Sequence, residues 1–403
     1  MSSSIALSRA KPASTPFWAR LGVSWFRKMR FPAKAGVILV FLLVPILVTS
    51  WMLVSDRRAV VAATQMERQG LQAIQLMVPA MEATQLLRRA LVDQANGVDR
   101  PDVPDLRKRF QASMDSLTRQ GKPLLDGLPD PGTEHWQALM AAFKAAEAQP
   151  AGLSAAEVRK PYVDISEQLG DLVEHAVDQS GLALDPDGDS YYLMAAGTVT
   201  LPDLLETFGL TRAALASLAA DAENGKLLAQ AAARLAVDKK LLGLVEGDLK
   251  RVAEFNAELP VKAHMDKLAA ARDFVARMEP LVMQPGSALP APAEIVRQST
   301  AAIETLGALQ RAVAADLDRV LAAREARLNG RIVAGTVLIT LMALAGLYFF
   351  YCFFLSMRSG MRTLTERMKA MASGDLTDTL VPKGRDETAD DGGPRETGCE
   401  LRV

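Results

Sequence analysis

Two long runs without a charged residue dominate the hydrophobic pattern of this 403-residue chain. The first run covers residues 35–54, and the second covers residues 332–355. At about 1.5 Å per helical residue, each run is long enough to cross the roughly 30 Å apolar core of a bilayer. Pro45 lies inside the first run, and membrane helices tolerate proline more readily than soluble helices do. The pattern therefore predicts two transmembrane helices.

A cleaved signal peptide is the alternative interpretation of the first run. The run is longer than the apolar core of an ordinary signal peptide, 34 residues precede it, and no clear cleavage site of small residues follows it. We therefore expect residues 35–54 to be an uncleaved membrane anchor.

Basic residues flank both runs on the sides that face the chain termini. Residues 1–34 contain no acidic residue but seven basic ones: Arg9, Lys11, Arg20, Arg27, Lys28, Arg30 and Lys34. The second run is followed by Arg358, Arg362, Arg367 and Lys369. Because basic flanks stay in the cytoplasm, we expect both termini there and residues 55–331 on the exported side. The aromatic residues of the basic segment, Trp18, Trp25 and Phe26, fit either a segment on the inner leaflet or a plain topology signal.

The region between the two runs has the spacing of amphipathic helices. Apolar residues recur every three or four positions, and the β-branched runs typical of strands are absent. Helices are expected over about 57–92, 105–127, 133–148, 154–182, 190–220, 222–258 and 262–279, and from about 293 onward. The last helix has the clearest apolar stripe: Ile303, Leu306, Leu309, Val313, Leu317, Val320 and Leu328. The predicted fold is all-α, with an exported sensor of one or two four-helix-type bundles between the spans.

Composition excludes several classes of function. A net charge of −1 excludes a globally basic nucleic-acid-binding protein, so no nucleic-acid partner is expected. The two cysteines, Cys352 and Cys399, are too few for a disulfide scaffold or a cysteine-rich zinc site. The histidines, His135, His175 and His264, lie far apart in the sequence. No pattern of catalytic residues is present, and we expect neither an enzyme nor a bound metal or cofactor.

Three aspartates in one short segment, Asp185, Asp187 and Asp189, suggest calcium as one interpretation. A calcium loop of the EF-hand type has glycine at its sixth position and a carboxylate at its twelfth. Here Gly188 is fourth and Ala196 is twelfth. The better interpretation is a turn made by Asp-Pro and Asp-Gly, with Asp189 or Ser190 capping the next helix.

The segment after the second span resembles a HAMP domain, the parallel four-helix relay of bacterial transmembrane receptors. Met361, Leu364, Met368 and Met371 have the spacing of a coiled-coil seam. Gly374, Asp375 and Leu376 match the connector of that family, and Asp386 and Glu387 match the entry to its second helix. The chain departs from the family at Gly360, where many members have proline, and after residue 389. We expect a partial HAMP domain over residues 356–389, truncated before the second helix, and an atypical tail over residues 390–403.

The whole layout resembles a bacterial methyl-accepting chemotaxis protein, which the LDPDGDSYYLM segment at 184–194 and the GRDE segment at 384–387 also support. The resemblance implies a homodimer in the lipid of the inner membrane, with a periplasmic sensor for a small molecule or a periplasmic binding protein. It implies contact with a chemotaxis kinase and adaptor only if a full-length form exists. The input half of a sensor histidine kinase or diguanylate cyclase has the same layout, and a purely structural membrane protein is the third alternative. The ligand-binding residues are not identifiable from the sequence.

Overall fold

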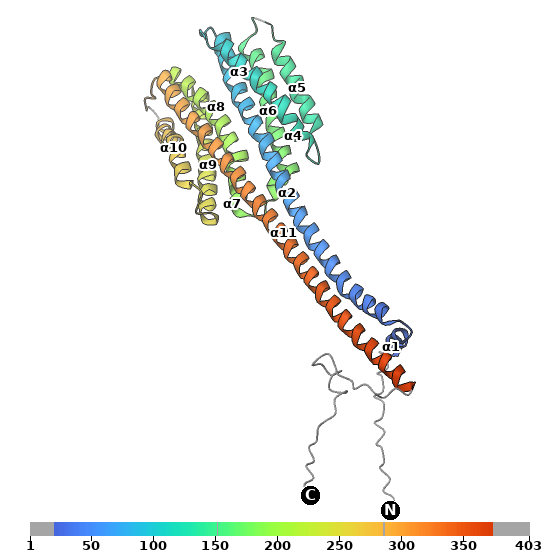
Figure 1. Cartoon of the computed structure of the whole chain (residues 1–403). Helices are drawn as coiled ribbons and strands as arrows, with labels where there is room; N and C mark the ends of the chain where they lie inside the picture. Colours follow the sequence, from blue (N-terminus) through green and yellow to red (C-terminus); the bar gives the residue numbers. More distant parts are fainter. Residues whose placement is uncertain (1–19, 151, 285–286, 374–403) are drawn as a thin grey trace, which may run out of the picture. The chain divides into compact units, whose positions relative to one another are not determined.

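The computed structural model describes residues 20–150, 152–284 and 287–373 (Figure 1). Over these ranges the chain forms helices joined by turns and loops, and it contains no strand. The predicted all-α class is therefore confirmed. The helices are α1 (Arg20–Arg27), α2 (Phe31–Ala95), α3 (Val103–Ser116), α4 (Lys122–Asp126), α5 (Thr133–Glu147), α6 (Ala155–Ser180), α7 (Gly188–Met194), α8 (Leu201–Ala220), α9 (Gly225–Phe255), α10 (Val261–Met283) and α11 (Pro292–Ala372).

Two helices of the described chain, α2 and α11, are long and apolar enough to cross a membrane. Their most apolar windows are not covered by other parts of the chain, and side chains such as Phe41 and Phe349 are 75% and 69% exposed. In the unit formed by residues 1–56 and 332–403, the ring of Phe31 stacks on that of Phe354 at 5.7 Å between centroids. Exposed apolar surface of this kind is typical of helices that contact lipid.

Residues Arg57–Arg331 form a second compact unit with one contiguous apolar core. Within it α5 packs against α6, α8 packs against α9, and α9 packs against α10. Figure 1 shows α3 to α6 gathered around the 57–95 part of α2, and α8 to α10 gathered with the 292–331 part of α11. Hydrogen bonds between side chains connect the two helix groups: Arg68 of α2 donates to Glu325 of α11, and Arg88 of α2 donates to Glu206 of α8. The unit is therefore built around two long helices that belong to different ends of the sequence.

Proline explains the two places where the helices depart from α-helical geometry. The stretches Leu117–Gly121 and Ala195–Thr200 are π-helical, and each is followed closely by a proline, Pro123 and Pro202. A proline ring clashes with the carbonyl one turn earlier and removes one N–H donor, and a widened turn relieves that clash. The helix expected over 190–220 is therefore present as α7, a π-helical turn and α8.

The apolar stripe of the last helix faces the core as predicted, with Leu306, Leu309, Val313 and Leu317 fully buried. Polar residues between the stripe positions are buried as well, and Asp316 is one of them. Asp316 is only 3% exposed, and its Oδ2 lies 2.7 Å from Nε2 of His264 on α10. His264 is therefore a buried partner of a carboxylate, which offsets the cost of burying that charge.

Glycine allows α2 and α6 to approach each other closely at Gly70. A Cβ atom at this position would lie 2.3 Å from Cβ of Ser180 and 3.1 Å from the carbonyl oxygen of Ala176. Both neighbours are attached to the backbone of α6, so a side chain at position 70 can be accommodated only if the two helices separate.

We expect the Gly70→Ala variant to lower the free energy of unfolding by about 1–2 kcal/mol, because overpacking outweighs the gain in helix propensity. Gly170→Ala on α6 is the matched control, since no atom lies within 4 Å of its Cβ position. The control should raise stability by up to ~1 kcal/mol. Thermal unfolding of the full chain, followed by circular dichroism in micelles, measures both effects. Equal stabilisation by the two substitutions would contradict the close approach of α2 to α6.

Candidate functional site

The unit Arg57–Arg331 contains a cavity of about 1210 Å³. Residues of α2, α8 and α11 form most of its wall. Helices α3 and α6 each contribute one arginine, and α9 contributes Leu227, Gln230 and Arg234. Much of the wall is apolar, including Leu71, Ile74, Val78, Leu205, Leu210, Val296 and Ile303. A cavity of this size, mainly apolar with a few polar groups, is typical of sites that bind small organic molecules.

The floor of the cavity lies where the π-helical turn before α8 meets α11. A Cβ atom at Gly197 would lie 2.9 Å from Cγ1 of Val313, so glycine permits this close contact. Nearby, Nε2 of Gln310 donates to the carbonyl oxygen of Gly197 at 3.5 Å, and Gln310 Oε1 is buried without a partner in the part of the chain described. Gln310 Oε1 is therefore enclosed by the protein and is not exposed to the cavity.

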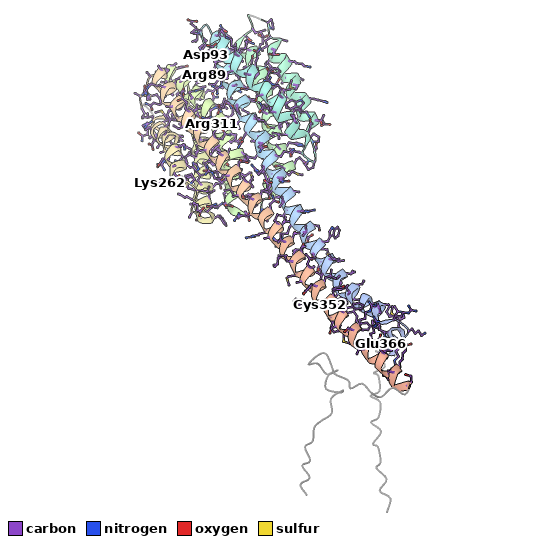
Figure 2. All side chains as sticks on the ribbon, viewed as in Figure 1. Arg89, Asp93, Lys262, Arg311, Cys352 and Glu366 are labelled. Atoms are coloured by element: carbon purple, nitrogen blue, oxygen red, sulfur yellow. The ribbon has the colours of Figure 1, made fainter. Side chains whose placement is uncertain are left out.

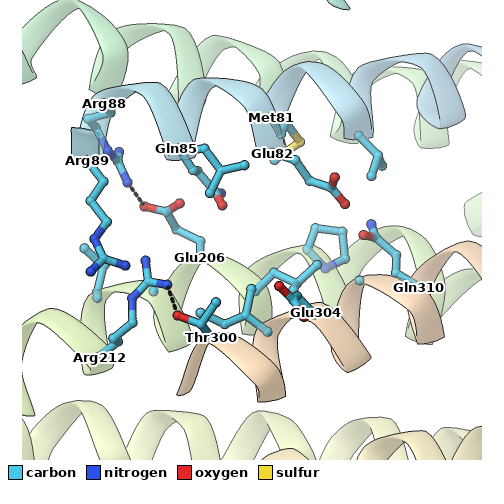
Figure 3. Close-up of a pocket in the computed structure, with 18 of the residues that line it drawn as sticks. Met81, Glu82, Gln85, Arg88, Arg89, Glu206, Arg212, Thr300, Glu304 and Gln310 are labelled. Carbon is cyan, nitrogen blue, oxygen red and sulfur yellow. Dashed lines mark hydrogen bonds and ion pairs between the residues drawn. The ribbon is translucent and has the colours of Figure 1, made fainter. Parts of the chain in front are cut away.

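Seven arginines and four acidic residues line the cavity, so its formal charge is positive. Glu82 on α2 contacts two of these arginines: Arg311 lies 3.0 Å from its Oε1 and Arg109 lies 3.2 Å from its Oε2. Arg88 lies 3.0 Å from Glu206 on α8. Figure 3 shows the Arg88–Glu206 pair bridging α2 and α8. These three arginines are therefore paired.

At one end of the cavity, Arg89 from α2 and Arg212 from α8 direct their guanidinium groups toward each other (Figure 3). The hydrogen bond that Arg212 makes is to a neutral group, Oγ1 of Thr300, at 3.2 Å. Among the described residues, no carboxylate lies within 4.0 Å of Arg212. Arg89 has Asp93 at 3.7 Å, but that carboxylate lies closer, at 2.5 Å, to Arg100.

The electrostatics at this end of the cavity reflect the missing counter-charge. Burial, and next the positive charge of Arg89, lower the pKa of Arg212 to about 10, while Asp93 acts in the opposite direction. Burial likewise lowers the pKa of Arg89 from its usual range. Desolvation and a nearby like charge each disfavour the charged form of a cation. An anion placed here would relieve both penalties.

A second cluster of charges surrounds Arg324 of α11. Its guanidinium donates to Asp185 Oδ1 at 2.9 Å and to Glu67 Oε2 at 3.2 Å, and its Nε lies 2.9 Å from Asp187 Oδ2. Arg324, Glu67 and Asp185 are each less than 9% exposed. Two of the three aspartates considered for calcium therefore face an arginine.

The Asp185–Asp189 segment makes a turn as predicted, but its helix cap differs. Asp185 Oδ1 accepts from the backbone N–H of Asp187, and α7 begins at Gly188 with Asp187 as its N-cap residue. The expectation that Asp189 or Ser190 caps this helix is wrong, because the helix begins before either residue. Ser190 is instead buried against Arg324, to which its Oγ is hydrogen-bonded.

Burial changes the ionisation of Glu67 beside Arg324. Burial, and next the negative charge of Asp185, raise the pKa of Glu67 to about 7, while Arg324 acts in the opposite direction. Glu67 thus takes up a proton near neutral pH although it contacts an arginine.

Two histidines that are distant in the sequence lie together in the structure. The rings of His135 on α5 and His175 on α6 are 5.5 Å apart, and Nε2 of His175 lies 2.9 Å from the carbonyl oxygen of Asp130. Within the described ranges, no three His, Cys, Asp or Glu side chains are grouped in a way that could hold a metal ion.

The predicted relay residues lie at the end of α11 and beyond it. Met361, Leu364, Met368 and Met371 all belong to this helix, and the side chains of Met361 and Met368 are 52% and 63% exposed. Gly374, Asp375, Leu376, Asp386 and Glu387 lie outside the described residues. Pairing of the methionine seam therefore stays a prediction.

Sequence reasoning identified none of the residues that line the cavity. The available signal was weak: Arg88, Arg89 and Arg212 interrupt otherwise apolar helical segments rich in leucine and alanine. A charged residue at such a position fits a solvated face as well as a binding site. Helix packing decides between these two interpretations.

The raised pKa of Glu67 makes stability depend on pH with a defined sign. Its pKa is higher in the folded chain than the usual 4.5, so its contribution is complete below pH 4.5 and is lost as the pH rises toward 7. We expect the Glu67→Gln variant to equal the parent in acid and to exceed it above pH 7, by at most about 3 kcal/mol in free energy of unfolding.

Glu325→Gln is the matched control with the opposite sign. Hydrogen bonds from Gln65 and Arg68 lower the pKa of Glu325, so its contribution is present above the usual pKa and is lost as the pH falls. Denaturant unfolding of the full chain from pH 4 to pH 8 separates the two variants. If the difference in free energy of unfolding between Glu67→Gln and the parent did not change with pH, the raised pKa of Glu67 would be contradicted.

No family model, curated protein or solved structure matches this chain. A functional proposal therefore depends on features of the chain itself: its two apolar helices, the cavity between long helices, and the distribution of charge within that cavity.

Proposed function

We propose that this chain is a two-span membrane receptor of the bacterial chemoreceptor type, without catalytic activity of its own. In this proposal, residues 57–331 form a periplasmic sensor of paired helical bundles. The observation that carries it is that α2 and α11 both line the cavity and both continue into an apolar segment long enough to cross a membrane. A ligand in the cavity would thus contact the two helices that enter the membrane.

The contacts between α2 and α11 support a role in signalling. Arg68 on α2 donates to Asp318 at 3.1 Å and to Glu325 at 2.8 Å, and Glu325 also accepts from Gln65 at 2.7 Å. Such directional bonds favour one register between the two helices. A ligand that binds one register better than another shifts the population by its difference in affinity. A small sliding movement of one helix is a common form of such a change.

The seam on the last part of α11 supports a dimer as the signalling state. Met361 and Met368 are exposed in the single chain, and methionine side chains at this spacing form the core of a parallel coiled coil. A HAMP-like relay needs helices from two chains. The proposed partners are a second copy of this chain, membrane lipid and a small-molecule ligand, with a chemotaxis kinase and adaptor as partners of any full-length form.

The proposal places both termini in the cytoplasm and the helical unit in the periplasm. Reporter fusions at residues 200 and 370 should therefore give opposite results with an alkaline phosphatase reporter, which is active only after export: activity at 200 and none at 370. The reason is the set of basic residues that precedes the first span and follows the second. Equal activity of the two fusions would contradict the topology.

A chimera tests the sensor role. Residues 1–373, joined to the signalling part of a characterised chemoreceptor and produced in a bacterium without receptors, should restore a response to yeast extract. Gly209 lines the cavity and has no atom within 4 Å of its Cβ position, so Gly209→Leu places a side chain in the cavity. We expect this variant to lose at least tenfold in sensitivity.

Gly243→Leu on α9 is the matched control, because this position also has open space around it and does not line the cavity. The control should respond like the parent chimera. Equal sensitivity of the two variants would show that ligands act elsewhere, and a chimera without any response would count against the receptor proposal.

A further inference from the structure

One end of the cavity holds an arginine, Arg212, without a carboxylate partner in the described chain. Arg109 and Arg311 both contact Glu82, and Arg88 contacts Glu206. Arg89 faces Arg212 at its end of the cavity, and the carboxylate nearest to Arg89 is held by Arg100. The positive charge is therefore concentrated where α2, α8 and the start of α11 meet.

Two half-buried guanidinium groups that face each other are costly unless an anion lies near them. Solvent is partly excluded from both side chains: that of Arg89 is 33% exposed, and Arg212 is half-buried. This burial lowers the pKa of both groups. A carboxylate fits this place because each guanidinium can donate two parallel hydrogen bonds to it. The hydroxyl of Thr300 accepts from Arg212 and still has its own proton to donate.

The rest of the cavity restricts what the anion can be. Beyond the arginines, the wall is formed largely by aliphatic side chains from α2, α8 and α11, among them Ile74, Val78, Leu205 and Ile303. Inorganic phosphate or a small dicarboxylate would leave this surface in contact with water. A ligand with an apolar body would bury it, at a gain of about 25 cal/mol per Å².

We propose that Arg89 and Arg212 bind the carboxylate of an amphipathic monocarboxylic acid whose apolar body occupies the aliphatic part of the cavity. This inference rests on the proposed sensor function and names the ligand class of its cavity. Arg212 is the main anchor, since within the described ranges its hydrogen bond is to the neutral hydroxyl of Thr300. Arg89 contributes the second cation.

Isothermal titration calorimetry of the full chain in lipid nanodiscs tests the proposal, with empty nanodiscs as the reference. The probes are acetate, butanoate, hexanoate and octanoate, with hexanamide as the uncharged match for hexanoate and succinate and inorganic phosphate as anions without an apolar body. We expect saturable binding that tightens with chain length, by up to about fourfold per methylene. Hexanamide, succinate and phosphate should each bind at least tenfold more weakly than hexanoate.

Substitutions locate the anchor. Arg212→Gln should weaken octanoate binding by roughly 10- to 100-fold, as expected for loss of a hydrogen bond to a charged group. Arg212→Lys should recover part of that loss, because it keeps the charge without the planar fork. Arg311→Gln is the matched control: Arg311 lines the same cavity but is paired with Glu82, so its loss should change octanoate binding less than threefold.

Four results would overturn the proposal: absence of saturable binding by any of the monocarboxylates, hexanamide binding as tightly as hexanoate, succinate or phosphate binding more tightly than octanoate, or equal effects of Arg212→Gln and Arg311→Gln. Helical content of each variant by circular dichroism ensures that a loss reflects the site. The chimera distinguishes this inference from the sensor function. A chimera that responds through the cavity, together with failed carboxylate binding, refutes the ligand class alone.

Discussion

The buried guanidinium of Arg324 is the interaction on which the packing of residues 57–331 depends most. It lies among Glu67 of α2, the turn at Asp185 and Asp187, and Ser190 of α7. A charge this deeply buried needs carboxylates beside it, and loss of the arginine would leave the acids around it without a counter-charge. The network therefore joins α2, α11 and the turn before α7. Figure 2 draws the side chains of the described residues on the ribbon.

The same network explains why one carboxyl group retains its proton near neutral pH. Glu67, Asp185 and Asp187 together provide more negative charge than one arginine balances, and Glu67 is buried. Protonation of Glu67 reduces the repulsion among the acids at a lower cost than exposing them to water. Along the same pair of helices, Arg68 bonds to Asp318 and Glu325 on a more exposed face. The α2–α11 contact thus combines a buried network with solvated bridges.

The cavity lies farther along α2 and α11, beyond the Arg324 network, where α8 also lines the space between them. The Arg324 network and the ion pairs of Arg68 occupy one part of the contact between α2 and α11. Farther along α2, near residues 88–93, helix α8 also lines the cavity, and Arg88 pairs with Glu206 there. The space between these helices is bounded by aliphatic side chains and by arginines from six helices. Arg109 and Arg311 each contact the carboxylate of Glu82, whereas Arg212 contacts the neutral hydroxyl of Thr300, and this difference distinguishes a structural from a ligand-binding role.

The order and type of the elements were determined by the sequence alone. Uncharged runs of 20 residues or more, apolar positions spaced by three and four, and prolines at the breaks are local features, and they are sufficient to identify helices and their limits. The apolar face of the last helix is local in the same sense, and Leu317 is buried as its spacing predicts. Residues beyond Ser373, including Asp375 and Glu387, belong to the sequence-based expectation alone.

Only the tertiary structure decided which polar residues are buried and which charges meet. Asp316 and His264, or Arg89 and Arg212, lie on different helices, and each residue alone has the pattern of a solvated side chain. Their burial depends on the angle and register at which distant helices pack, and these follow from the whole core and not from any local segment. For that reason the sequence determined the helices and the two membrane-spanning candidates, while the cavity and its unbalanced positive charge required the packed fold.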